Sequence, residues 1–113
     1  HEMFSGDSAK FSPTAIAFID HLGEILKNQK KRIMIEGHVS PNRKGEFAST
    51  WDLAAARSVN LLRYMQMKYD FSAPHLAAAT FGDSRPLMTS AKNGDLAKND
   101  RVELLVYYTD SDF

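Results

Sequence analysis

Three side chains that could do chemistry stand around one polar loop of this sequence. His38 ends an apolar run that is typical of a strand, Ser40 lies at the start of the loop, and Arg57 lies in the early turns of the helix expected after it. The end of a strand, the loop that follows and the start of the next helix meet in space, so these side chains could line one pocket. We therefore predict the functional site there.

Arg57 is expected at the border of the buried face of its helix, one turn from Leu53. A guanidinium in that position needs an anionic partner, and its planar fork suits a carboxylate through paired charge-assisted hydrogen bonds. The carboxylate could belong to a ligand. It could equally belong to the chain itself, with Asp52, Glu46 and Glu103 as candidates, and the pattern leaves both alternatives open.

His38 has the usual position of a catalytic histidine, but the sequence offers no second catalytic partner. His1, His21 and His75 have no Glu or Asp at a metal-ligand spacing, and no strained nucleophile motif occurs. The absence of cysteine excludes disulfides, thiolate metal sites and a cysteine nucleophile. We predict a protein without catalytic activity, metal or cofactor, in which His38 is structural or weakly functional. A hydrolase that uses His38 is the minority interpretation.

Length and composition are those of one ordinary globular domain. The chain has 113 residues, of which 43% are hydrophobic and 25% charged, so it can bury a core without a metal or disulfide. Fourteen basic and fourteen acidic residues cancel, which gives no net attraction for nucleic acid or an anionic membrane. No apolar run approaches the roughly 20 residues of a membrane span, and no signal peptide is visible. The abrupt start at His1 suggests an excised domain whose targeting segment lies elsewhere.

The remaining elements follow from periodicity and from the residues that begin and end helices. Ser12 before Pro13 starts a helix, whose apolar stripe is Ala15, Phe18, Ile19, Leu22, Ile25 and Leu26. Ser49 to Asp52 has the spacing of a capping box, in which Asp52 reaches back. Strands are predicted at residues 33–38, 76–81 and 102–108, with a strand or turn at 4–11. We predict an α+β sandwich, a single domain over residues 1–113 with a polar tail at 109–113, in which both helices pack on one face of a mixed sheet.

Five short motifs occur together in the order and spacing of a known family. They are FSGDSAKFS at residues 4–12, IEGH at 35–38, STWDLAAAR at 49–57, FGDSRP at 81–86 and KNDRVE at 98–103. The chain resembles the OmpA-like peptidoglycan-binding domain over nearly its whole length. It resembles in particular the periplasmic domain of the flagellar stator protein MotB, in its long loop and its Ser-x-Trp-acidic-Leu helix start. Each motif alone is weak, but five in sequence are fairly specific.

The resemblance implies a β-α-β-α-β-β sandwich that grips the peptide stem of peptidoglycan. In that family the arginine matching Arg57 pairs with a carboxylate of the diamino acid in the stem, and the residues matching Asn99 and Arg101 lie near the same pocket. With His38, Val39 and Ser40 at the end of the strand, these are the ligand-binding residues that the resemblance indicates. It also implies a periplasmic location, a homodimer, and contact with membrane motor or envelope proteins.

The chain departs from the family pattern at three positions. Val39 replaces a threonine, and Ser40 replaces the aspartate that receives the ammonium group of the ligand. Removing one partner of a desolvated charge pair costs roughly 2 to 5 kcal/mol. Asp100 stands where the family usually has another arginine, and Glu46 in the loop could supply the missing carboxylate. Two hypotheses follow: a peptidoglycan anchor, or an OmpA-like domain that has lost wall binding and serves protein contact or dimerisation.

Overall fold

Two helices and a three-stranded mixed sheet make up the fold, as the sequence predicted. The computed structural model describes residues 3–27, 31–86 and 100–108. The sheet order is β2-β1-β3, with β1 parallel to β2 and antiparallel to β3. In chain order the elements are α1 (Pro13–Leu26), β1 (Lys31–His38), α2 (Thr50–Tyr69), the short 3₁₀ helix η1 (Ala73–His75), β2 (Leu76–Thr80) and β3 (Arg101–Tyr108).

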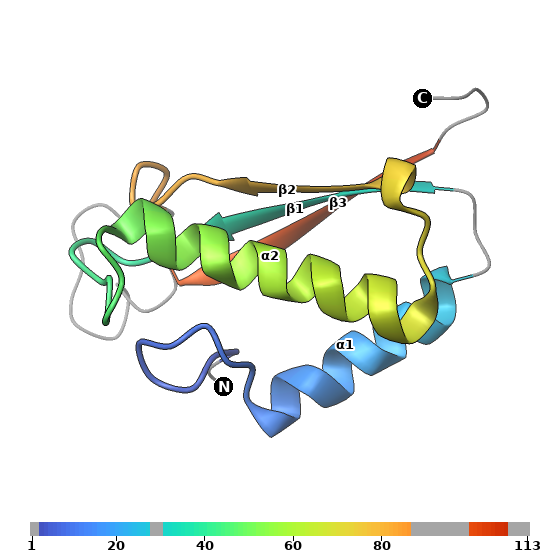
Figure 1. The fold of residues 1–113 in the computed structure, drawn as a ribbon, viewed down its shortest axis with the longest axis horizontal. Helices are drawn as coiled ribbons and strands as arrows, with labels where there is room; N and C mark the ends of the chain where they lie inside the picture. The colour runs from blue at the N-terminus through green and yellow to red at the C-terminus, as the bar shows by residue number, and fades with distance from the viewer. Residues whose placement is uncertain (1–2, 28–30, 87–99, 109–113) are drawn as a thin grey trace.

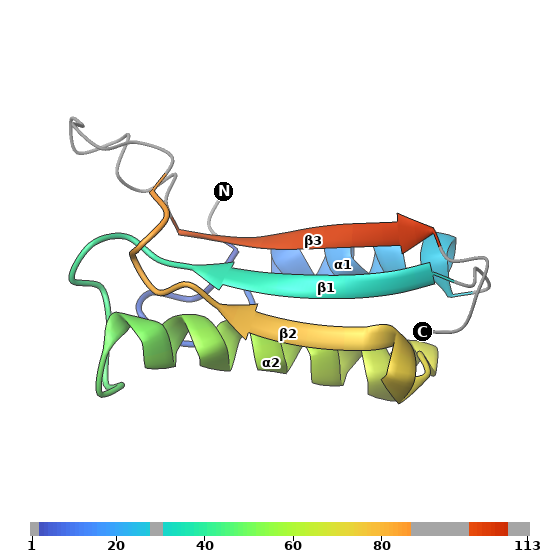
Figure 2. The ribbon, with the colours of Figure 1, turned by 90° about the horizontal axis from the view of Figure 1, so that it is seen from above.

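Both helices lie on the same side of the sheet, so the domain has two layers (Figure 1). Seen from above, α2 runs beneath β2 and α1 beneath β1 and β3 (Figure 2). Successive residues of a strand point to opposite faces, so Ile33 and Ile35 of β1 face the helices, while Glu36 and His38 face the other way. Ile33 and Ile35 belong to the main core, which also contains Ile19, Leu61, Met65, Tyr69 and Phe71.

The residues that start and end α2 explain its length. Ser49 caps the N-terminus, because its hydroxyl accepts the Asp52 backbone N–H at 3.2 Å. Asp52 reaches back as the capping box predicts, but it accepts a hydrogen bond from the Ser49 hydroxyl at 2.6 Å. Asp70 ends the helix in the left-handed region, with φ 56° and ψ 38°. Because the cap fixes where the helix begins, Arg57 lies two turns after the N-cap residue, Ser49.

A close approach between β1 and α2 fixes the distance between the strand end and the helix. A Cβ atom on Gly37 would lie 2.2 Å from the backbone oxygen of Ala54. Glycine is therefore required on the strand for this contact. The approach brings the end of β1, and the loop that follows it, against the turn of α2 that precedes Arg57.

The apolar stripe predicted for α1 is partly wrong. Ala15 and Ile19 are buried, but Phe18 is 56% exposed and Ile25 50% exposed. The third buried position is Gly23, where an added Cβ would lie 2.5 Å from the ring of Tyr69 on α2. The ring packs directly on the glycine, which turns the larger apolar side chains of α1 partly toward solvent.

The opening segment forms a bridged loop and contributes no strand to the described sheet. Phe4 and Phe11 pair in a single antiparallel bridge, and their ring centroids are 4.8 Å apart. The backbone N–H of Ser5 donates to Lys10 at 2.8 Å, which closes the loop between them. Of the order implied by the resemblance, the described residues therefore show α-β-α-β-β. Within them, no helix is both long and apolar enough to cross a membrane.

Asp20 joins the two helices and gives the fold a testable dependence on pH. Its carboxylate accepts hydrogen bonds from Tyr64 at 2.6 Å, Tyr69 at 2.7 Å and Lys68 at 2.9 Å. These bonds, that from Tyr64 first, lower the pKa of Asp20 to about 2. A carboxyl whose pKa is lower in the folded state stabilises the fold above its unfolded pKa of about 3.9, and that contribution is lost as the pH falls toward the folded value.

We expect the stability of the wild-type protein to fall more steeply between about pH 4 and pH 2 than that of Asp20→Asn, which has no carboxyl to titrate. Urea denaturation at several pH values measures both slopes. Tyr64→Phe removes only the strongest of the three bonds and should give an intermediate slope. Parallel pH profiles for wild type and Asp20→Asn would contradict this assignment.

Candidate functional site

Arg57 is buried and holds the N-terminal loop. Its side chain is 1% exposed. Nε donates to the carbonyl of Ser8 at 3.0 Å and Nη2 to the carbonyl of Gly6 at 3.1 Å. The guanidinium carbon lies 4.2 Å from the centre of the Phe4 ring, a distance that suits a cation–π contact. Nε and Nη2 of Arg57 are thus directed at the N-terminal loop, and Nη1 lies 3.9 Å from Oδ1 of Asp100.

A line of alternating charges, which we call the acid–arginine chain, runs from the N-terminal loop to Arg57. Arg43 donates from Nε to Asp7 at 2.5 Å and from Nη1 to Oδ2 of Asp100. Oδ1 of Asp100 accepts the backbone N–H of Ser40 at 2.6 Å and lies 3.9 Å from Nη1 of Arg57. The carboxylate beside Arg57 therefore belongs to Asp100, rather than to one of the three acidic residues that the sequence suggested.

The long loop at residues 39–48 is folded against the N-terminal loop. The N–H of Val39 donates to Gly82 at 2.9 Å, and the N–H of Arg43 donates to Ser40 at 3.1 Å. Gly45 has φ 56°, and a Cβ there would lie 2.4 Å from the backbone oxygen of Asp7. Backbone contacts and the pair between Arg43 and Asp7 therefore hold the two loops together, with Asp100 between them and α2.

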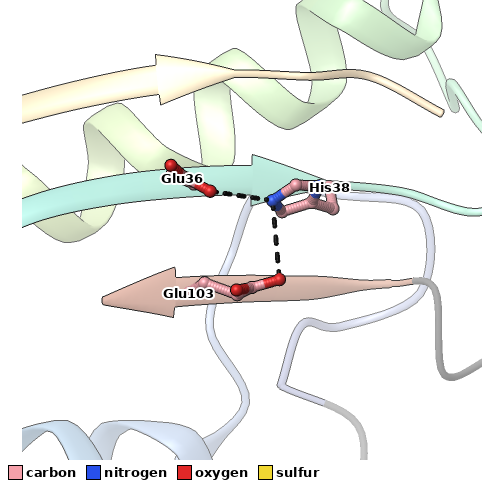
Figure 3. A group of neighbouring side chains, drawn as sticks. All are labelled: Glu36, His38 and Glu103. Carbon is pink, nitrogen blue, oxygen red and sulfur yellow. Dashed lines mark hydrogen bonds and ion pairs between the residues drawn. The ribbon is translucent and has the colours of Figure 1, made fainter. Parts of the chain in front are cut away.

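His38 belongs to a second cluster, on the face of the sheet opposite the helices. It is 2% exposed and its ring stacks on Phe81, with centroids 5.2 Å apart. Nε2 lies 3.4 Å from Glu36 and 3.7 Å from Glu103 (Figure 3). Burial, followed by the charge of Arg101, lowers the pKa of His38, and the two glutamates oppose this shift. The net shift favours the neutral form of the imidazole.

The three side chains of this cluster offer ligand types that a divalent metal accepts, but their surroundings fit a metal poorly. Their nearest ligand atoms lie within 4.8 Å of one another. However, Arg101 donates to Oε2 of Glu103 at 2.5 Å and brings a positive charge to the same oxygen. A ligating histidine normally donates its other ring N–H to an acceptor, and Nδ1 of His38 has no such partner in the described part of the chain. The arrangement is that of a buried histidine beside one ion pair, between Arg101 and Glu103.

The structure divides the predicted site residues between these two places. Ser40 and Arg57 meet at Asp100, whereas His38 and Arg101 lie in the second cluster, where Arg101 also donates to the carbonyl of Arg85 at 3.1 Å. Val39 is 1% exposed and packs in a small core cluster with Leu53 and Ala54. Asn99 lies outside the described residues. Glu46 is exposed in the long loop.

Sequence reasoning missed Arg43, Asp7 and Asp100 as a connected group, and it missed the partners of His38. A signal existed for the second cluster. Glu36 precedes His38 by two residues on one strand, which places both side chains on the same face. Glu103 is the residue directly opposite Glu36 in the register of β1 with β3. For Arg57, the partners are mainly backbone carbonyls, which carry no signal in a sequence.

Two helices on one face of a mixed sheet, a long loop after the central strand and a buried arginine beneath that loop define the class of this protein. The chain belongs to the OmpA family, whose family model matches residues 3–100. The prediction made from the five motifs is therefore confirmed.

Similar proteins fall in the same class. The peptidoglycan-associated lipoprotein of Pseudomonas aeruginosa is 29% identical over 101 residues, which cover 89% of this chain and 58% of that protein. The periplasmic domain of Helicobacter pylori MotB shares the fold with a TM-score of 0.82 at 20% identity, over 96% of this chain and 71% of that structure. The cell wall anchor of the T6SS from Pseudomonas aeruginosa has a TM-score of 0.83 at 24% identity, over 95% of this chain and 76% of that structure. This chain thus spans little more than half the length of the lipoprotein.

Proposed function

We propose that this domain is a non-catalytic peptidoglycan-binding module that anchors an envelope protein to the cell wall. Its ligand would be the peptide stem, held through a carboxylate of the diamino acid. Membership of the OmpA family and the functions named for the similar proteins support this class of function. The particular complex that we propose is a flagellar motor stator in the periplasm, with the domain acting as a homodimer.

The observation that carries the proposal is the arrangement of two donors and a further guanidinium around one carboxylate. The backbone N–H of Ser40 and Nη1 of Arg43 donate to the carboxylate of Asp100, and Nη1 of Arg57 lies 3.9 Å from it. They come from the long loop and from α2, so folding brings them together without a ligand. A backbone N–H and guanidinium groups are the donors that recognise carboxylates most strongly. The domain therefore has a preformed position for a carboxylate group.

The ammonium group of the diamino acid would be held less well than the carboxylate. Ser40 offers a neutral hydroxyl where the family pattern has an aspartate. Glu46 is exposed in the same loop and could supply a negative charge to a ligand that lies over the loop. We expect the affinity of this domain for the stem to rest mainly on the carboxylate.

Co-sedimentation with isolated peptidoglycan sacculi tests the proposal, with the ligand varied rather than the protein. We expect the wild-type domain to pellet with sacculi and to be released by an excess of the free diamino acid. The same diamino acid with its carboxylates amidated is the matched control and should release nothing. Retention at both low and high salt would separate this binding from adsorption to anionic wall polymers, which screening weakens.

Wild-type protein that stays in the supernatant at both salt concentrations would overturn the proposal. The second candidate function would then apply, in which the domain has lost wall binding and serves protein contact or dimerisation. It has one observation in its favour, the serine at position 40. Ser40→Asp distinguishes the two, because a domain that has lost only this charge should regain wall binding with it.

A further inference from the structure

We propose that Asp100 is an internal occupant of the carboxylate position, so that an external carboxylate binds only when the Asp100 side chain is displaced. This inference rests on the proposed function, because it assumes that a ligand carboxylate uses these donors. Asp100 directly precedes β3, and its side chain is 13% exposed. Its carboxylate therefore comes from the C-terminal part of the chain and enters a position formed by the long loop and α2.

Both oxygens of Asp100 are engaged with groups of the long loop, so a second carboxylate would compete with Asp100 for them. Oδ1 takes the N–H of Ser40 at 2.6 Å and faces Nη1 of Arg57 at 3.9 Å. Oδ2 takes Nη1 of Arg43. Nε of Arg43 donates to Asp7, and Nε and Nη2 of Arg57 donate to the carbonyls of Ser8 and Gly6. A ligand carboxylate that uses the Ser40 N–H and Nη1 of Arg43 would have to replace Asp100.

The charges also argue against Asp100 as a receptor for the ammonium group of the ligand. An ammonium group at Oδ2 would lie beside the guanidinium of Arg43. An ammonium group at Oδ1 would lie beside the Ser40 N–H and the guanidinium of Arg57. In both places the ammonium group would meet positive charge. Asp100 thus has the contacts of a bound carboxylate. The remaining alternative is that Asp100 forms an ion pair that only stabilises the fold. Removing the charge of Asp100 should raise the affinity for the ligand in the first case and not in the second.

If Asp100 competes with the ligand, the apparent affinity for the ligand equals the intrinsic affinity multiplied by the fraction of molecules in which the site is free. Asp100→Asn removes the charge while keeping the shape and an oxygen that can accept the Ser40 N–H. A partly exposed ion pair contributes up to about 1 kcal/mol, which corresponds to about five-fold in affinity. We therefore expect Asp100→Asn to bind the soluble stem peptide about five-fold more tightly than wild type.

Isothermal titration with the soluble stem peptide gives this comparison. Asp83→Asn is the matched control, because Asp83 accepts a side-chain hydrogen bond from Thr50 at 3.2 Å and takes no part in the acid–arginine chain. It should keep the wild-type affinity. A stem peptide with amidated carboxylates should gain nothing from Asp100→Asn.

A second measurement needs no variant and covers the case in which Asp100→Asn fails to fold. On titration of the wild-type protein with stem peptide, the NMR signal of the Asp100 carboxyl carbon should shift as its side chain leaves the site. Binding without that shift would overturn the inference, as would an Asp100→Asn protein that is folded and binds no more tightly than wild type. In both cases the wild type still binds, so the proposed function survives. If folded wild type and folded Asp100→Asn both fail to bind, the proposed function and the inference fall together.

Discussion

Replacing Arg57 with methionine should lower the free energy of unfolding by about 3 kcal/mol, because it removes a buried guanidinium and the hydrogen bonds that it donates. The side chain is 1% exposed and donates to the carbonyls of Gly6 and Ser8. Methionine fills much of the same volume but donates nothing, so two part-buried hydrogen bonds are lost and the carboxylate of Asp100 loses a neighbouring positive charge. Urea denaturation of both proteins measures the difference.

Arg63→Met is the matched control, since Arg63 lies on the same helix and is exposed. Its effect should stay within about 0.5 kcal/mol. A loss below about 1 kcal/mol for Arg57→Met would mean that the N-terminal loop does not depend on this residue. An Arg57 variant that folds poorly would also bind the cell wall poorly. Weaker wall binding by such a variant is therefore evidence for a ligand contact only if the variant is shown to be folded.

Gly37→Ala should cost about 3 kcal/mol, at the upper end of the range for overpacking. The added methyl group would lie 2.2 Å from the backbone oxygen of Ala54 and 2.9 Å from its carbonyl carbon. Backbone atoms of a helix cannot rotate away as a side chain can, so β1 and α2 must separate. Thermal unfolding and urea denaturation both report the loss.

Gly6→Ala provides the comparison for this substitution. Gly6 has φ 58°, but nothing lies within 4 Å of an added Cβ. Only backbone strain remains there, which costs about 1 kcal/mol. If Gly37→Ala were no more damaging than Gly6→Ala, the contact between β1 and α2 would be looser than the structure shows.

Much of the fold could be predicted because it depends on local patterns. Alternation gave β3, serine caps gave the starts of both helices, and β1 followed from a short apolar run. The exposed face of α1 could not be predicted in the same way. An apolar stripe is recognised from its large side chains. The ring of Tyr69, however, packs on α1 at Gly23, which has no side chain to contribute to such a stripe.

The sequence predicted that Ser40 and Arg57 lie close together, but it predicted neither their contacts nor the separate position of His38. Ser40 and Arg57 do meet, yet the carboxylate between them comes from Asp100, which is 60 residues from Ser40. Arg57 reaches carbonyls 49 and 51 residues away. Pairs so distant in sequence are set by the tertiary arrangement of loops, and no spacing rule identifies them.

The alternation of charge in the acid–arginine chain also bears on how a ligand first meets the domain. Asp7, Arg43, Asp100 and Arg57 follow one another as negative, positive, negative and positive, so their fields largely cancel at distances greater than the separation of the charges. Beyond the Debye length of about 8 Å at physiological salt, little of either sign remains. These four side chains therefore give an approaching charged polymer no electrostatic steering. They can distinguish between polymers only at contact, through how long each polymer stays bound.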